Sequence, residues 1–108
     1  MDRDLFLELV GEAPERPTEL SLEVTEAIDC GGYSRQKVCF DLDADERIEA
    51  YILIPNGLDE RVPAVVCHHQ HASMYNRAKS EMVGLFGDKD LFYGKEMAEL
   101  GYVVIAAD

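Results

Sequence analysis

Basic residues are scarce in this sequence of 108 residues. Lys and Arg number 10 against 22 Asp and Glu, which gives a formal net charge of −12 at pH 7. Nucleic acids and anionic membrane surfaces are bound through clusters of Lys and Arg. The charge therefore argues against both as partners, and solubility is its simplest explanation.

Long apolar runs, a leader and paired cysteines are also lacking. No run approaches the roughly 18 residues of a membrane span, and residues 1–4 lack the basic and apolar segments that open a signal peptide. The cysteines Cys30, Cys39 and Cys67 are odd in number and have no metal-knuckle spacing. Free thiols in a reducing compartment are their simplest interpretation. We therefore expect a cytoplasmic protein without a cofactor.

The N-terminal two thirds of the chain contain short elements separated by turn residues. Residues 1–19 read as a short amphipathic helix over 4–10 and a linker with Pro14 and Pro17. From residue 20 the apolar period changes to two, which is typical of half-buried strands. The pattern predicts an antiparallel meander of three strands, over residues 20–28, 33–42 and 47–54.

The rest of the chain has a different pattern. Continuous apolar runs over residues 62–67 and 102–107 indicate strands buried on both faces. Between them, residues 88–100 read as a helix that Asp88 caps and Gly101 ends. Its expected buried face consists of Leu91, Phe92, Met97 and Leu100. Strand, helix and strand form a right-handed parallel βαβ unit, so the fold class is α/β, with one partial domain over residues 20–108.

Five short motifs follow one another between Pro63 and Asp108. They are His69-Gln70-His71, Lys79-Ser80-Glu81, Gly84-Leu85, Tyr93-Gly94 and the Gly-Tyr-Val-Val of residues 101–104. In this order they resemble the N-terminal portion of an α/β-hydrolase, in the branch that is like dienelactone hydrolases and acetyl-xylan esterases. The resemblance implies a serine-type hydrolase that acts on a small carboxylic ester or lactone. Ala78 and Met82 depart from the Gly and Pro that the branch tends to have.

The nucleophile of that family is missing from the chain. It is a Ser or a Cys on a sharp elbow, often Gly-x-Ser-x-Gly, and the acid and the His follow it. None of the four serines lies in such a motif, Cys67 is inside a predicted strand, and no His follows His71. We therefore expect a chain that is inactive alone, either because it is part of a longer protein or because another molecule completes its sheet.

Residues after the first apolar run are the candidates for the site. The resemblance implies that a backbone N–H of His71 or Gln70 forms part of the oxyanion hole. It also suggests that His69, Lys79 and Glu81 line the site. In the alternative interpretation, His69 and Gln70 only fix the loop, and Lys79 and Glu81 form a solvated local ion pair.

Other residues favour structural roles or no role. His68, His69 and His71 lack the further ligand that a metal site needs, so no metal is expected. Asp108 follows a parallel strand, where ligands bind in such sheets, but a structural role is favoured. Phe92 and Tyr93 are expected in the core. A second hypothesis is a non-catalytic module that forms a homo-oligomer through the strand at residues 102–107.

Overall fold

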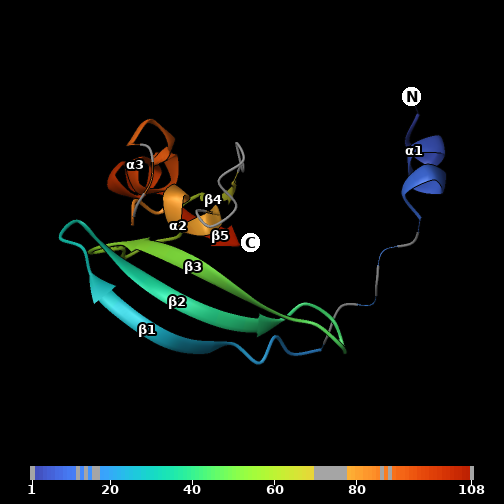
Figure 1. Ribbon diagram of the computed structural model, residues 1–108, viewed down its shortest axis with the longest axis horizontal. Helices are drawn as coiled ribbons and strands as arrows, with labels where there is room; N and C mark the ends of the chain where they lie inside the picture. The colour runs from blue at the N-terminus through green and yellow to red at the C-terminus, as the bar shows by residue number, and fades with distance from the viewer. Residues whose placement is uncertain are drawn as a thin grey trace.

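The chain forms a five-stranded mixed sheet with short helices on it (Figure 1). The computed structural model describes residues 2–11, 13, 15, 18–69, 78–85, 87 and 89–107. The sheet order is β1-β2-β3-β5-β4. In chain order the elements are α1 (Arg3–Val10), β1 (Glu23–Asp29), β2 (Tyr33–Asp41), β3 (Arg47–Pro55), β4 (Ala64–His68), α2 (Ala78–Met82), the 3₁₀ turn η1 (Lys89–Leu91), α3 (Tyr93–Glu99) and β5 (Val103–Ala107).

The predicted meander is confirmed. Strands β1, β2 and β3 pair antiparallel in sequence order, and β2 pairs with β3 in unbroken register from Tyr33 opposite Pro55 to Asp41 opposite Arg47. The turn between β1 and β2 contains Gly31 at φ +94°, a conformation that suits glycine. The N–H of Gly31 donates to Asp29 Oδ1 at 2.8 Å, which closes the turn.

The parallel pair of the predicted βαβ unit is also confirmed, because β4 and β5 run parallel from Ala64 opposite Val103 to His68 opposite Ala107. Strand β5 lies between β3 and β4 and pairs antiparallel with β3. The fold is therefore α/β with a mixed, mostly antiparallel sheet. The C-terminal strand is not an edge, so the predicted route to self-association through residues 102–107 is wrong, although self-association itself stays a prediction.

Burial differs from the prediction at both edges of the sheet. Strand β1 was expected to be half-buried, but all seven of its residues are exposed. Strand β4 was expected to be buried on both faces, but only Cys67 is buried and Val66 is 64% exposed. Both strands lie at edges, where fewer neighbours cover their side chains. A run of apolar residues does not reveal where a strand lies in the sheet.

The helix predicted over residues 88–100 is shorter and broken. Residues 89–91 form η1, and α3 begins at Tyr93. Leu100 follows the end of α3 and is 73% exposed, so its place on the buried face was wrong. The helix instead buries Gly94 and Ala98, which lie one turn apart. Leu91, Phe92 and Met97 are half-buried, and Asp88 lies outside the described residues.

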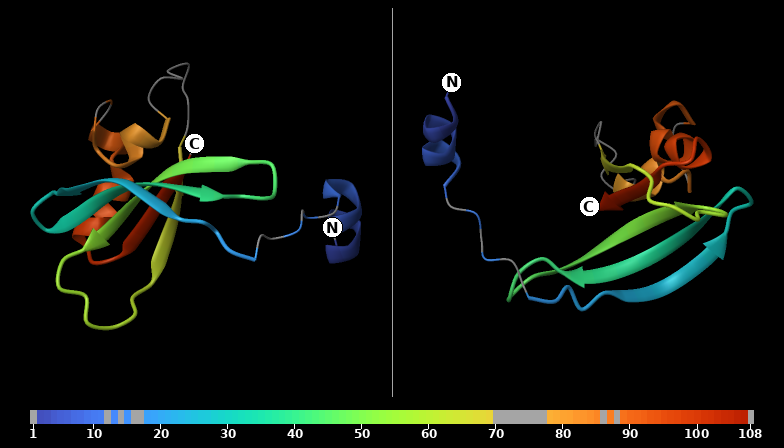
Figure 2. Two further views of the ribbon diagram at one scale, coloured as in Figure 1. Left: turned by 90° about the horizontal axis from the view of Figure 1, so that it is seen from below. Right: turned by 180° about the vertical axis from the view of Figure 1, so that it is seen from behind.

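The core lies between one face of the sheet and the helices α2 and α3 (Figures 1 and 2). Its buried members are Tyr33, Tyr51, Leu53, Cys67, Met82, Val83, Ala98, Val104 and Ala106. Residues directly opposite on paired strands share a face. By the register, Ile52, Ile105 and Val66 therefore lie on the opposite face, which neither α2 nor α3 covers.

The N-terminal helix α1 stands apart from the sheet (Figure 2). It begins at Arg3, one residue before the predicted start, and Asp2 Oδ1 caps it by accepting the N–H of Leu5 at 2.8 Å. None of its residues is buried, and its large apolar side chains Leu5, Phe6, Leu7, Leu9 and Val10 are all exposed. Among the described residues, no helix is long and apolar enough to cross a membrane.

Candidate functional site

The candidate site lies where β4 ends. The last two residues of β4 are Cys67 and His68, which pair with Ala106 and Ala107 of β5. The carboxyl ends of parallel strands are the edge at which α/β sheets bind ligands. His69 follows directly and is half-buried. The oxyanion candidates Gln70 and His71 lie outside the described residues, as does Asp108, so their roles stay predictions.

Tyr93 connects α3 to the end of β4. Its hydroxyl donates a hydrogen bond to the main-chain oxygen of His68, 25 residues earlier in the sequence. The Tyr93 ring is half-buried against the core, as expected. No sequence pattern indicates this hydrogen bond, because the periodicity of a helix does not show which strand end a tyrosine contacts.

Cys67 and Tyr93, which lie at this bond, stay protonated at neutral pH. Burial raises the pKa of the Cys67 thiol above its ordinary value. Burial also raises the pKa of Tyr93, and the nearby Cys67 and Glu81 raise it further. A protonated, buried thiol is a poor nucleophile. Cys67 is therefore not activated as a nucleophile in this environment.

Lys79 is buried, and it joins α2 to the sheet. Its Nζ lies 3.3 Å from Glu49 Oε1 on β3 and 5.8 Å from the centroid of the Tyr51 ring, within range of a cation–π interaction. The same Glu49 oxygen lies 3.5 Å from Lys37 Nζ. The expected solvation of the Lys79 and Glu81 side chains is wrong, because Lys79 is 7% exposed and Glu81 is 1% exposed. The sequence shows a period-two strand at Glu49 and no sign of this contact.

Glu81 is also buried, with 1% of its surface exposed. Its carboxylate lies against Gly87, where an added Cβ would approach Glu81 Cδ and Cγ to 2.9 Å and Oε2 more closely still. Gly87 has φ +107°, which also favours glycine. Lys79 and Glu81 thus hold α2 between the sheet and the turn that precedes η1. Their predicted contact with a substrate stays a prediction.

A close helix contact positions Tyr93. An added Cβ on Gly94 would come within 2.7 Å of the main-chain oxygen of Met82. Only glycine lets α3 approach α2 this closely. The Tyr93-Gly94 motif therefore combines a hydroxyl that reaches β4 with a contact that holds the start of α3.

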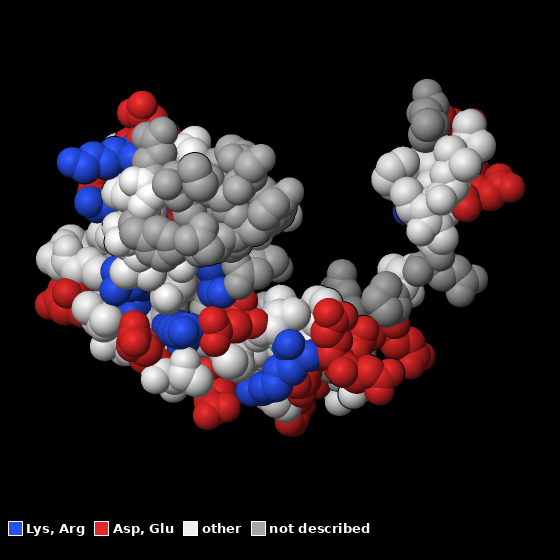
Figure 3. Space-filling view, in the orientation of Figure 1, with Lys and Arg blue, Asp and Glu red and all other residues white. Residues whose placement is uncertain are grey.

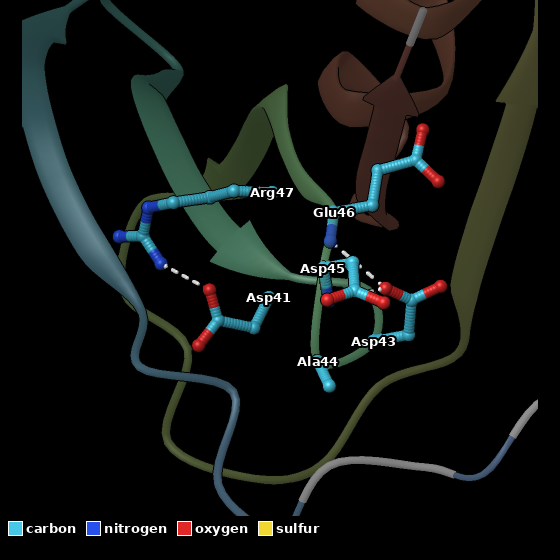
Figure 4. A pocket seen from close by; sticks show the side chains of 6 residues that line it. All are labelled: Asp41, Asp43, Ala44, Asp45, Glu46 and Arg47. Atoms are coloured by element: carbon cyan, nitrogen blue, oxygen red, sulfur yellow. Dashed lines mark hydrogen bonds and ion pairs between the residues drawn. The ribbon is translucent and has the colours of Figure 1, made fainter.

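A pocket in the part of the chain that the structure describes lies elsewhere, in the β2–β3 hairpin. It is a cavity of about 220 Å³, lined by Asp41, Asp43, Ala44, Asp45, Glu46 and Arg47 (Figure 4). Asp43 Oδ1 accepts the N–H groups of Asp45 and Glu46, each at 2.8 Å, so its carboxylate closes the turn.

Acidic side chains are spread over the face shown in Figure 3. Within the described ranges, no group of three or more His, Cys, Asp or Glu is arranged to hold a metal ion.

Comparison with known proteins supports a hydrolase family for the chain. It is 30% identical over 107 residues to a protein of Bacillus subtilis (strain 168) named "Putative hydrolase YtaP". The match covers 98% of this chain and 36% of that protein, so the chain spans little more than a third of its relative. No family model matches the sequence. No solved structure matches it either.

Proposed function

We propose that the chain is the N-terminal portion of a serine-type hydrolase of the dienelactone-hydrolase-like and acetyl-xylan-esterase-like branch. It contributes part of the oxyanion hole to the hydrolysis of a carboxylic ester or lactone. The observation that carries the proposal is the position of His69-Gln70-His71, directly after the parallel strand β4. The similarity to a protein named as a hydrolase supports it.

The arrangement of the sheet supports the proposal. Strand β4 is an edge strand, so its outer side leaves room for a further strand. A strand that pairs there would bring a nucleophile beside the end of β4. Backbone N–H groups after β4 would then bind the negative charge that develops on the carbonyl oxygen. Because the role belongs to the backbone, it does not depend on the His and Gln side chains.

The chain alone is proposed to be inactive, because it contains no Gly-x-Ser-x-Gly motif. The purified chain is assayed with p-nitrophenyl acetate, with and without a serine-directed phosphonate. We expect no hydrolysis that is sensitive to the phosphonate. Turnover that the phosphonate abolishes would contradict this part of the proposal. The three thiols are free, which supports the cytoplasm as the proposed location.

A chimera tests the oxyanion role. In it, this chain replaces the aligned segment of the B. subtilis protein, and ester hydrolysis is measured. We expect activity in the chimera, a loss of roughly 10²–10³ in kcat when the donor residue becomes Pro, and little change when it becomes Ala. The variants are Gln70→Pro, Gln70→Ala, His71→Pro and His71→Ala. Full activity in both Pro variants, or an inactive chimera beside an active parent, would contradict the proposal.

A second candidate is a non-catalytic module that associates with itself. The edge strand β4, on which Val66 is 64% exposed, favours this candidate. The contact would form through β4 and not through β5, which lies inside the sheet. Unpaired strand edges are sites where sheets join. Light scattering over a range of concentrations tests the idea. A molar mass that stays at the monomer value of 12.1 kDa at high concentration would exclude it.

A further inference from the structure

We infer that Tyr93 is a positioning residue, whose hydroxyl holds the His68 carbonyl and so fixes the peptide plane from which the chain leaves β4. The hydrogen bond links the first residue of α3 to the last residue of β4. The functional meaning of the inference rests on the proposed function, because the predicted oxyanion donors follow this peptide. The structural part does not depend on it.

The support beneath Tyr93 is rigid. At Gly94, an added Cβ would lie 2.7 Å from the Met82 main-chain oxygen and 3.5 Å from Val104 Cγ1. The first turn of α3 is thus wedged between α2 and β5. Met82 and Val104 are both fully buried, so neither neighbour has room to move away. A hydroxyl on such a support can hold a carbonyl in one orientation.

The peptide that follows His68 lies at the end of an edge strand, where few main-chain hydrogen bonds hold it in place. Among the described strands, β4 pairs with β5 alone, and His68 itself is exposed. The Tyr93 hydroxyl adds a bond at the point where this pairing ends. Glu81 and Cys67 lie close enough to the phenol to influence it, and both are buried. The bond itself lies at the surface, where water competes for its groups, so its net strength is that of an ordinary hydrogen bond.

A tyrosine that only fills the core would behave differently. In that case the ring alone matters, and Phe would replace it without effect at His68. A positioning role requires the oxygen, so Tyr93→Phe must change the His68 peptide while the ring still packs. Tyr102→Phe is the matched control, since Tyr102 is also half-buried but precedes β5 at the opposite end of the β4–β5 pair.

The test uses the 108-residue chain with a ¹³C label on the His68 carbonyl. We expect Tyr93→Phe to shift this resonance upfield, as loss of a hydrogen bond does, and Tyr102→Phe to leave it unchanged. Pulsed alkylation of Cys67, read by mass spectrometry, should become about fivefold faster in Tyr93→Phe, the effect of losing one hydrogen bond of ordinary net strength. An unchanged carbonyl resonance in a folded Tyr93→Phe chain would overturn the inference.

Two further measurements keep the outcomes separate. If Tyr93→Phe does not fold, incorporation of 3-fluorotyrosine in the unaltered sequence makes the phenol a stronger donor, and the His68 resonance must then move downfield. In the active chimera, Tyr93→Phe should lower kcat about fivefold with KM unchanged. A chimera without ester turnover would refute the hydrolase proposal, while the carbonyl resonance would still decide the role of Tyr93.

Discussion

At the scale of single residues, small contacts decide how the helices sit on the sheet. Gly94 lets α3 approach the Met82 main chain, and Gly87 leaves room for the buried carboxylate of Glu81. Lys79 pairs with Glu49 across the same interface. These three contacts fix the short helix α2, which has only five residues and little stability of its own.

Replacing Gly94 tests the close helix contact. Gly94→Ala should lower the free energy of unfolding by about 1–3 kcal/mol, because main chain lies where the new methyl must go. Alanine favours a helix more than glycine does, but by less than this cost. Gly32→Ala is the control, since nothing lies within 4 Å of its added Cβ. Urea unfolding measures both, and equal stability of the two variants would contradict the contact.

Replacing Lys79 tests the interaction between α2 and the sheet. Lys79→Met keeps most of the chain length but removes the charge, and we expect a loss of about 1 kcal/mol in stability, because the pair is partly shielded from water. Lys95→Met is the matched control. Lys95 pairs with Glu99 at 3.8 Å on an exposed helix surface, so its loss should cost less than about 0.5 kcal/mol. An unfolding free energy that falls equally in both variants would refute the distinction.

At the scale of helices and strands, the sequence predicts whether a segment is a helix or a strand better than it predicts which neighbours cover that segment. Alternation identifies β2 and β3, because one face of each strand must be apolar to pack. It could not show that β1 is uncovered or that β4 is an edge, since strand order depends on the whole sheet. The motif His69-Gln70-His71 was found by resemblance. The contacts Tyr93–His68 and Lys79–Glu49 join distant segments, and no local pattern encodes them.

The difference between an edge strand and an interior strand is measurable with one substitution in each. Val66 is 64% exposed on β4, whereas Val104 is fully buried on β5. Val66→Thr should change stability by less than about 0.5 kcal/mol. Val104→Thr should lower it by about 1–3 kcal/mol, because the hydroxyl is buried in an apolar core. Chemical denaturation of both variants checks the order, and a greater loss at Val66 would show that β4 is covered.

At the scale of the whole molecule, the described helices are distributed unequally about the sheet. Helices α2 and α3 cover one face of the sheet, and α1 lies away from it (Figure 1). The radius of gyration is 15.8 Å, whereas a compact domain of this length has about 13 Å. The molecule is therefore more extended than its length requires.

Alkaline pH should destabilise the folded chain. Burial is the main cause of the raised pKa values of Cys67, Tyr93 and Tyr33. The unfolded chain then releases these protons at lower pH than the folded chain does. The stability that these protonated groups contribute is fully present below their ordinary pKa values, which are 9.0 for Cys and 10.0 for Tyr. It is lost as the pH rises from these values through the raised pKa values of the folded chain.

Unfolding measured between neutral pH and about pH 11 checks this expectation. The free energy of unfolding should fall from about pH 9 upward, and Cys67→Ala should make the first part of the fall shallower. Cys39→Ala, which removes a half-buried thiol on β2, is the control and should leave the slope as it is. A flat profile, or equal slopes in the two variants, would contradict the role of the buried thiol.

The position of β5 between β3 and β4 also sets an order of assembly. Strands β1, β2 and β3 are joined by short turns and can pair as soon as they leave the ribosome. Strand β4 is made next, but its partner in the described sheet is β5 alone. Strand β4 therefore cannot pair with β5 until both helices have been synthesised and residues 103–107 have left the ribosome. A nascent chain arrested before that point would present β4 to chaperones as an unpaired apolar segment.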